Sequence, residues 1–229
     1  MSQETLKRQT YNRILEDIIY RKYPVDYILK EKELSEKFGI SKAPVREALI
    51  ELSTEDIVKS IPRAGYRIVQ FTEKDISEAT ELRLMLEVPV LETIIKTISL
   101  ETINKLRVVV ENFKYATANS REPLDTWWND NINFHVALNA LAANDLLNST
   151  LKTIIRRQWR AIAQLYSRAE LADYLGYKPN THLTLLRAIE KKDIRKASST
   201  LSADILSISY LFSHRINHRA IPDMSKKLL

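Results

Sequence analysis

The first fifty residues carry apolar side chains at helical spacing. Leu6, Tyr11, Ile14, Leu15, Ile18 and Ile19 share one face and predict an amphipathic helix over roughly residues 4–21. The segments KEKELSEKFGIS and SKAPVREALIELS predict two shorter helices, the first ended by Gly39 and the second capped by Ser41. Only Gly39 and Ile40 separate these two helices, which is the spacing of a helix-turn-helix.

Two short β-like runs follow this helical segment. The first contains Ile57, Val58 and Ile61, and the second contains Tyr66, Ile68 and Val69. The sequence Pro62-Arg63-Ala64-Gly65 between them has the composition of a turn, so the runs predict a β-hairpin. A helix-turn-helix followed by a hairpin predicts a winged helix over residues 1–71.

From residue 72 onward the pattern is helical almost throughout. It predicts helices over roughly 73–97, 100–118, 124–141, 144–168, 180–191 and 193–213, with a kink at Pro89. The expected fold class is therefore mostly α, with an N-terminal winged helix-turn-helix carrying a small hairpin wing and an all-α helical bundle over residues 72–229.

The composition excludes several classes of protein. Among 229 residues there is no cysteine, which excludes disulfides, thiol nucleophiles and thiolate zinc sites. The three glycines leave almost no room for a glycine-rich phosphate loop. No run of about 18 uncharged apolar residues occurs. The polar start MSQETLKRQTYNR lacks the apolar region of a secretory signal, so we expect a cytoplasmic protein that does not enter a membrane.

The placement of basic residues is more informative than their number. The net charge is +6, but residues 1–70 hold 13 basic and 11 acidic residues and thus contribute little of it. A helix-turn-helix inserts its second helix into the major groove, which places Ser41, Lys42, Ala43 and Arg46 near base edges or phosphates. The alternative is a helical hairpin packed in a core with solvated charges.

Two further positions fit the same interpretation. Lys32 begins the preceding helix, where a phosphate is the natural partner. Gly65 at the hairpin tip would let the backbone approach the minor groove, with Arg63 and Arg67 on either side. We therefore predict that the winged helix binds double-stranded DNA.

The run ELSEKFGISKAPVREALIELSTEDIVKSIPRAGYRIV resembles the N-terminal domain of GntR-family transcriptional regulators. It departs from the family pattern at Ala43, where threonine is common, and at Glu55-Asp56, where Glu-Gly is usual. The resemblance implies that the DNA contacts lie at Lys32, Ser41, Lys42, Ala43, Arg46 and Gly65.

The rest of the chain resembles the effector domain of the FadR subfamily, the FCD type. The resemblance rests on ELRLMLE, on the Asn131–His135 motif, on HLTLLRAI from His182 and on DIRKA from Asp193. Many members of that subfamily hold a divalent metal with an Asp or Asn and three His. By position, the resemblance implies the ligands Asn131, His135, His182 and Asp204 for zinc, nickel or manganese, with Asp204 in place of a histidine.

Alternatives remain open for this domain. His135 and His182 could be buried histidines in a polar pocket without metal. The resemblance places Arg83 where it would bind an effector carboxylate beside Asn131, His135 and His182, but a same-helix pair of Arg83 with Glu87 is equally compatible with the spacing. The basic run Arg156, Arg157 and Arg160 is expected to form a solvated face.

These features predict a ligand-responsive transcriptional repressor, a homodimer on a near-palindromic operator, which senses a small organic or sugar acid. One alternative is a metal-dependent enzyme built on the bundle, although the chain has no HExxH, no Gly-x-Ser-x-Gly and no cysteine, so we expect no catalytic residues. Another is a DNA-tethered protein-interaction module that binds no small molecule.

Overall fold

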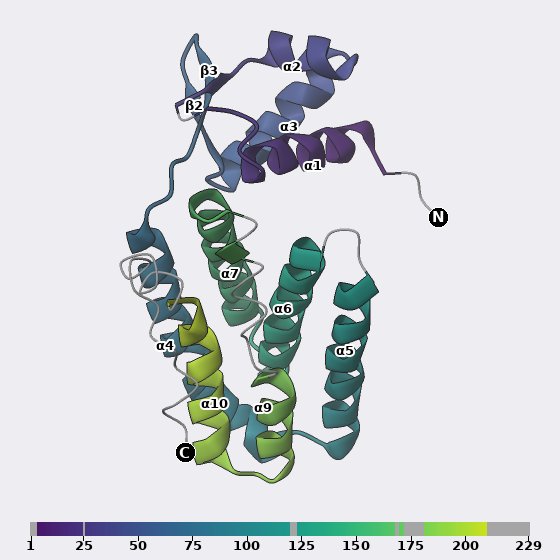
Figure 1. The fold of residues 1–229 in the computed structure, drawn as a ribbon, viewed down its shortest axis with the longest axis vertical. Helices are drawn as coiled ribbons and strands as arrows, with labels where there is room; N and C mark the ends of the chain where they lie inside the picture. Colours follow the sequence, from purple (N-terminus) through teal and green to yellow (C-terminus); the bar gives the residue numbers. More distant parts are fainter. Residues whose placement is uncertain (1–3, 25, 120–122, 168–169, 172–180, 210–229) are drawn as a thin grey trace. The chain divides into compact units, whose positions relative to one another are not determined.

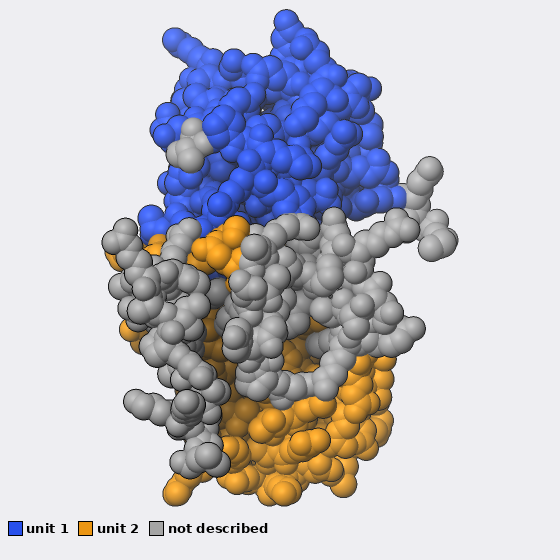
Figure 2. Space-filling model, in the orientation of Figure 1, with its two compact units in different colours: residues 1–72, 160–165 blue, residues 73–159, 166–229 orange. Residues whose placement is uncertain are grey.

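The protein consists of two compact units (Figure 2). The computed structural model describes residues 4–24, 26–119, 123–167, 170–171 and 181–209, without the side chains of 113–128. The first unit comprises residues 1–72 and 160–165, and the second comprises residues 73–159 and 166–229. The segment 160–165 is the end of a helix that begins in the second unit.

Three helices form most of the first unit (Figure 1). They are α1 (Leu6–Ile19), α2 (Glu31–Phe38) and α3 (Lys42–Thr54), and all three match the predicted helices. Gly39 adopts a left-handed conformation with φ of 67° at the end of α2, as its position predicted. The apolar faces meet in one core, in which Ile14, Val45 and Leu49 are fully buried.

The wing is a three-stranded antiparallel sheet rather than a two-stranded hairpin. The predicted strands are β2 (Val58–Ile61) and β3 (Gly65–Ile68), and β3 also pairs with the unpredicted strand β1 (Ile28–Leu29). A side chain at Gly65 would place its Cβ 2.4 Å from the carbonyl oxygen of Leu29, and φ at Gly65 is 132°. Glycine is therefore required at this position by the close approach of β1.

The second unit is helical wherever it has regular structure among the described residues. Its helices are α4 (Glu73–Thr97), α5 (Leu100–Asn119), α6 (Pro123–Ala140), α7 (Asp145–Leu165), α9 (Thr181–Glu190) and α10 (Ile194–Leu206), followed by a 3₁₀ turn at Ser207–Ser209. All six were predicted, and their ends agree to within a few residues. The exception is α10, which was predicted to continue to residue 213 but ends at Leu206, where the chain passes into the 3₁₀ turn; residues 210–213 lie outside the described residues.

Helices α4, α5, α6, α9 and α10 share the core of this unit (Figure 1). Leu91 and Ile95 of α4, Phe134 of α6 and Leu186 of α9 are almost completely buried there. The mostly α fold class with a winged helix-turn-helix is confirmed. None of the helices in the described ranges has the length and hydropathy needed to cross a membrane.

Candidate functional sites

The predicted DNA-contact residues lie on the surface of the first unit. Lys32, Ser41, Lys42, Ala43, Arg46 and Arg63 are exposed, and Gly65 is half-buried. Ser41 occupies the N-cap of α3, as predicted, but its side chain makes no capping hydrogen bond. Pro44, the third residue of α3, has no N–H and so removes one of the two backbone donors that a capping hydroxyl can use.

Arg46 is held by a carboxylate of the neighbouring helix. Its Nε donates to Glu31 Oε1 at 3.0 Å, and its Nη2 donates to Glu31 Oε2 at 2.9 Å. The Arg46 side chain is 60% exposed and that of Glu31 is 25% exposed. Because exposed ion pairs stabilise a fold by only about 0–1 kcal/mol, Arg46 can exchange this carboxylate for another anion at little cost.

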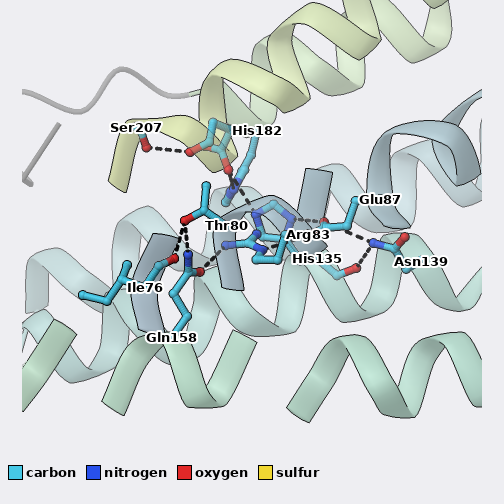
Figure 3. Close-up of polar contacts among 10 residues, drawn as sticks. Ile76, Thr80, Arg83, Glu87, His135, Asn139, Gln158, His182 and Ser207 are labelled. Atoms are coloured by element: carbon cyan, nitrogen blue, oxygen red, sulfur yellow. Dashed lines mark hydrogen bonds and ion pairs between the residues drawn. The ribbon is translucent and has the colours of Figure 1, made fainter. Parts of the chain in front are cut away.

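A second constellation lies inside the helical unit, where Figure 3 shows polar side chains of α4, α6, α7 and α9 pointing toward one another. Arg83 and Glu87, both on α4 and both at most 1% exposed, form an ion pair of 2.7 Å. Arg83 Nη1 also donates to Gln158 Oε1 of α7 at 2.9 Å, and Gln158 Nε2 donates to Thr80 Oγ1 at 2.7 Å. The same-helix pair that the spacing allowed for Arg83 is therefore formed. Arg83 Nη2 is buried and makes no hydrogen bond to any described residue.

His135 of α6 lies between two carboxylates. Its Nδ1 is 2.6 Å from Glu87 Oε2, a contact that is drawn as a dashed line in Figure 3. Its Nε2 is 3.0 Å from Asp204 Oδ2. Burial alone would lower the pKa of His135, but Glu87 and Asp204 raise it overall. Burial alone would raise the pKa of Glu87, but the charges of Arg83 and His135 hold it at about 2.

Three potential metal-ligating side chains converge beside this histidine. Donor atoms of His135, His182 and Asp204 lie within 4.8 Å of one another. His182 Nε2 is 3.6 Å from Asp204 Oδ2, and the imidazole ring of His182 stacks on Phe134 with ring centroids 4.0 Å apart. The structure thus brings together three of the four predicted ligands.

The fourth predicted ligand, Asn131, lies one helical turn before His135 on α6. It is 2% exposed, and its Oδ1 makes no hydrogen bond to any residue in the described ranges. A buried amide oxygen without a partner is costly, so this atom is available to a ligand or an ion.

Sequence reasoning missed the part that Gln158 plays. Gln158 is fully buried and lies on the same face of α7 as Leu151, Ile155 and Ile162. A single polar residue in such an apolar stripe is the signal that could have found it. The basic run of α7 is a solvated face only in part: Arg156 is exposed and the Arg157 side chain is 40% exposed, whereas the Arg160 side chain is 10% exposed and contacts Glu55.

Comparisons with known proteins place this geometry in a family. The model of the bacterial regulatory proteins of the gntR family matches residues 6–68, and the FCD domain model matches residues 78–206, more than half of the chain. The protein belongs to the GntR family. Within it, the FCD domain is consistent with the FadR-type subfamily that the sequence resembles.

Individual relatives of this GntR-family protein are distant. It is 27% identical over 216 residues to the Uxu operon regulator of Haemophilus influenzae, which covers 86% of this chain and 80% of the relative. It is 36% identical over 87 residues to the gluconate operon transcriptional repressor of Bacillus subtilis; this match covers 38% of this chain and 35% of the relative. The solved structure of McbR/YncC from E. coli has the same fold, with a TM-score of 0.64, 19% identity and coverage of 93% of this chain and 100% of that one.

The GntR-family protein is a ligand-responsive, DNA-binding transcriptional regulator. Its two domains match those of such regulators, and both sequence relatives are named as regulators of transcription. Nothing in these comparisons supports the alternative of an enzyme or of an interaction module without an effector.

Proposed function

We propose that this regulator is a cytoplasmic homodimer that represses transcription from a near-palindromic operator and responds to a small organic or sugar acid. In this proposal the acid and a divalent metal ion bind in the buried cluster of the helical domain. The single observation that carries the proposal is the convergence of His135, His182 and Asp204 beside the unpartnered atoms of Arg83 and Asn131.

The donor set suits a zinc, nickel or manganese ion. His135 Nε2 and Asp204 Oδ2 are 3.0 Å apart, and His182 Nε2 and Asp204 Oδ2 are 3.6 Å apart. These separations bracket the spacing of about 3.4 Å between ligands of a tetrahedral zinc ion with bonds of 2.1 Å. Glu87 at His135 Nδ1 is the second-sphere carboxylate that orients a ligating imidazole.

The charge balance of the cluster favours an acid as the effector. Arg83 and a protonated His135 balance Glu87 and Asp204, so the cluster without an ion is neutral. A divalent ion in place of the His135 proton supplies one net positive charge, which a carboxylate would neutralise. Arg83 Nη2 is then positioned to donate a hydrogen bond to that carboxylate.

The first unit supports the DNA part of the proposal. We assign DNA contacts to Lys32, Ser41, Lys42, Ala43, Arg46, Arg63 and Gly65. Helix-turn-helix proteins place two recognition helices in successive major grooves, which requires two protomers and gives the operator its near-palindromic form. The relative named as a gluconate operon repressor supports both the sign of regulation and the class of acid.

Thermal unfolding of the full-length protein tests the proposal. After treatment with EDTA and dialysis, the protein is melted with ZnCl2, NiCl2 or MnCl2, and then with D-gluconate or D-glucose added. We expect an ion to raise the melting temperature by mass action, and D-gluconate to raise it further only when the ion is present. D-Glucose is the matched neutral control.

A pair of variants assigns these shifts to the cluster. His182→Ala should abolish the shift caused by the ion, whereas the exposed Lys152→Ala on α7 should leave it unchanged. Equal stabilisation of the wild type by D-gluconate and D-glucose would refute the acid. Equal stabilisation of wild type and His182→Ala by the ion would refute the metal site.

A further inference from the structure

Helix α7 belongs to both units of the regulator. Residues 145–159 of this helix lie in the helical unit, and residues 160–165 lie in the unit that contains the winged helix. The sequence DLLNSTLKTIIRRQWRAIAQL contains no glycine or proline, so α7 has no residue typical of a kink or hinge. A movement of the helix at residue 158 is therefore expected to reach residues 160–165.

The end of α7 in the first unit bonds to the segment that follows the wing. Gln164 Oε1 accepts a hydrogen bond from the backbone N–H of Phe71 at 2.7 Å, and Gln164 Nε2 donates to the carbonyl oxygen of Val69 at 2.9 Å. A single side-chain amide thus satisfies a donor and an acceptor of the chain just before α4 begins.

The same end of α7 also contacts the recognition helix. Arg160 Nη1 lies 3.3 Å from the carbonyl oxygen of Glu55 and 3.4 Å from Glu55 Oε2. Glu55 is the C-cap of α3, and its carboxylate also accepts a hydrogen bond of 2.8 Å from Tyr11. A guanidinium at a helix C-terminus stabilises the helix dipole, so Arg160 fixes the end of α3 opposite to the DNA-contact residues.

The part of α7 that lies in the second unit contacts the buried cluster through Gln158, which lies close to the boundary between the units. Gln158 bonds to Arg83 and Thr80 with both ends of its amide. Gln158 and Gln164 are six residues apart, which corresponds to about 9 Å along a helix axis. A ligand that accepts a hydrogen bond from Arg83 would alter the contact between Arg83 and Gln158. Helix α7 would transmit that change to Gln164.

We propose that Gln158 and Gln164 are positioning residues that couple the buried cluster to the winged helix through α7. The cluster's state sets the position of α7 through Gln158, and Gln164 transfers that position to residues 69–71. This coupling rests on the proposed function only in taking the cluster as the effector site. Its test therefore uses neither metal nor acid.

A double-mutant cycle on operator affinity is the central experiment. The operator is a duplex selected from a random-sequence library by the full-length wild type, and its dissociation constant is measured by fluorescence anisotropy. We expect Gln158→Leu to change that constant about fivefold or more in the wild type, within the usual range of allosteric couplings, and less than about twofold in a Gln164→Ala background. Gln164→Glu, which keeps the acceptor for Phe71 but loses the donor for Val69, should give an intermediate result.

Two additions protect the test against misfolding. Thr80→Val removes one partner of Gln158 without touching α7 and should reproduce the effect of Gln158→Leu in a milder form. Lys152→Leu, at an exposed position of the same helix, is the matched control and should leave the affinity unchanged in either background.

Amide hydrogen exchange at Phe71 provides a readout without DNA. Exchange of this N–H should accelerate in Gln164→Ala and also in Thr80→Val, whose substitution lies in the other unit. Independent, multiplicative effects of Gln158→Leu and Gln164→Ala on operator affinity would overturn the coupling. So would an unchanged Phe71 exchange rate in Thr80→Val. Failure of the metal and acid experiments with a positive cycle here would reject the proposed effector and leave the coupling standing.

Discussion

The molecule contains two arginine–glutamate ion pairs, one on the surface of the winged helix and one buried in the helical unit. Arg46 meets Glu31 on the surface of the winged helix at 2.9 Å, and Arg83 meets Glu87 inside the helical bundle at 2.7 Å. The side chains of the first pair are 60% and 25% exposed, whereas those of the second are 1% and 0% exposed. The distances are nearly equal, so burial is the main difference between the two pairs.

Burial decides what each pair can do. Water screens the surface pair, so its rupture costs little and leaves Arg46 free for a phosphate or a guanine. The buried pair cannot be opened cheaply, because either partner alone would be an uncompensated charge in an apolar interior. The first pair therefore suits exchange of one anion for another, and the second suits a fixed site that accepts an additional ligand at Arg83 Nη2.

The largest difference between the two ion pairs is expected when the glutamate of each pair is removed in a separate variant. Glu87→Ala leaves Arg83 and His135 without their shared carboxylate, and we expect a loss of about 3–5 kcal/mol in the free energy of unfolding. The matched change Glu31→Ala should cost about 0–1 kcal/mol. Urea unfolding of the full-length protein measures both values, and similar losses in the two variants would show that burial does not set the difference.

Removing the surface arginine should affect DNA rather than stability. Arg46→Ala is expected to weaken operator binding by about 1–3 kcal/mol and to reduce the salt dependence by about one phosphate contact. Fluorescence anisotropy at several salt concentrations checks both effects. Arg195→Ala, an exposed arginine on α10, is the control and should bind the operator like the wild type. An unchanged affinity and salt slope in Arg46→Ala would remove this residue from the DNA interface.

The pH dependence of stability should come from the buried side of the comparison. The raised pKa of His135 adds stability that is complete below its unfolded value of about 6.5 and is lost as the pH rises through the folded value. Glu87, with a pKa lowered to about 2, adds stability above its ordinary range and loses it only in strong acid. Urea midpoints in EDTA should therefore fall from pH 6.5 upward. A His135→Gln variant with the same fall as wild type would contradict this assignment.

The smallest expected effect comes from releasing the surface arginine. Glu31→Gln removes the negative charge that holds Arg46, so operator affinity should rise by less than about 1 kcal/mol. Anisotropy at low salt gives the best sensitivity, because exposed charges are screened at high salt. Glu33→Gln is the matched control, because Glu33 is an exposed carboxylate of α2 that pairs with Lys30, which is not among the assigned DNA contacts. Weaker binding by Glu31→Gln would mean that the carboxylate orients Arg46 for DNA instead of competing with it.

Periodicity predicted the helices because long apolar stripes are visible in the sequence alone. It could not predict β1, since two residues have no period, and Gly65 was therefore assigned to the minor groove before its contact with Leu29 was known. The DNA-contact role of Gly65 stays a prediction. In the cluster, the Arg83–Glu87 pair could be predicted from the sequence because the two residues are four positions apart on one helix. Gln158 lies 75 residues from Arg83, and only the packing of α7 against α4 brings them together.

The neutrality of the buried cluster has a consequence for the abundance of the protein in the cell. Two cationic and two anionic side chains compensate one another once His135 holds a proton, so the cluster without an ion leaves no net charge in the interior of the helical unit. A newly synthesised chain in a metal-starved cell should then escape the proteases that remove unfolded protein. With the proposed metal site, scarcity of the ion would then change what the regulator senses but not how many copies of it the cell contains.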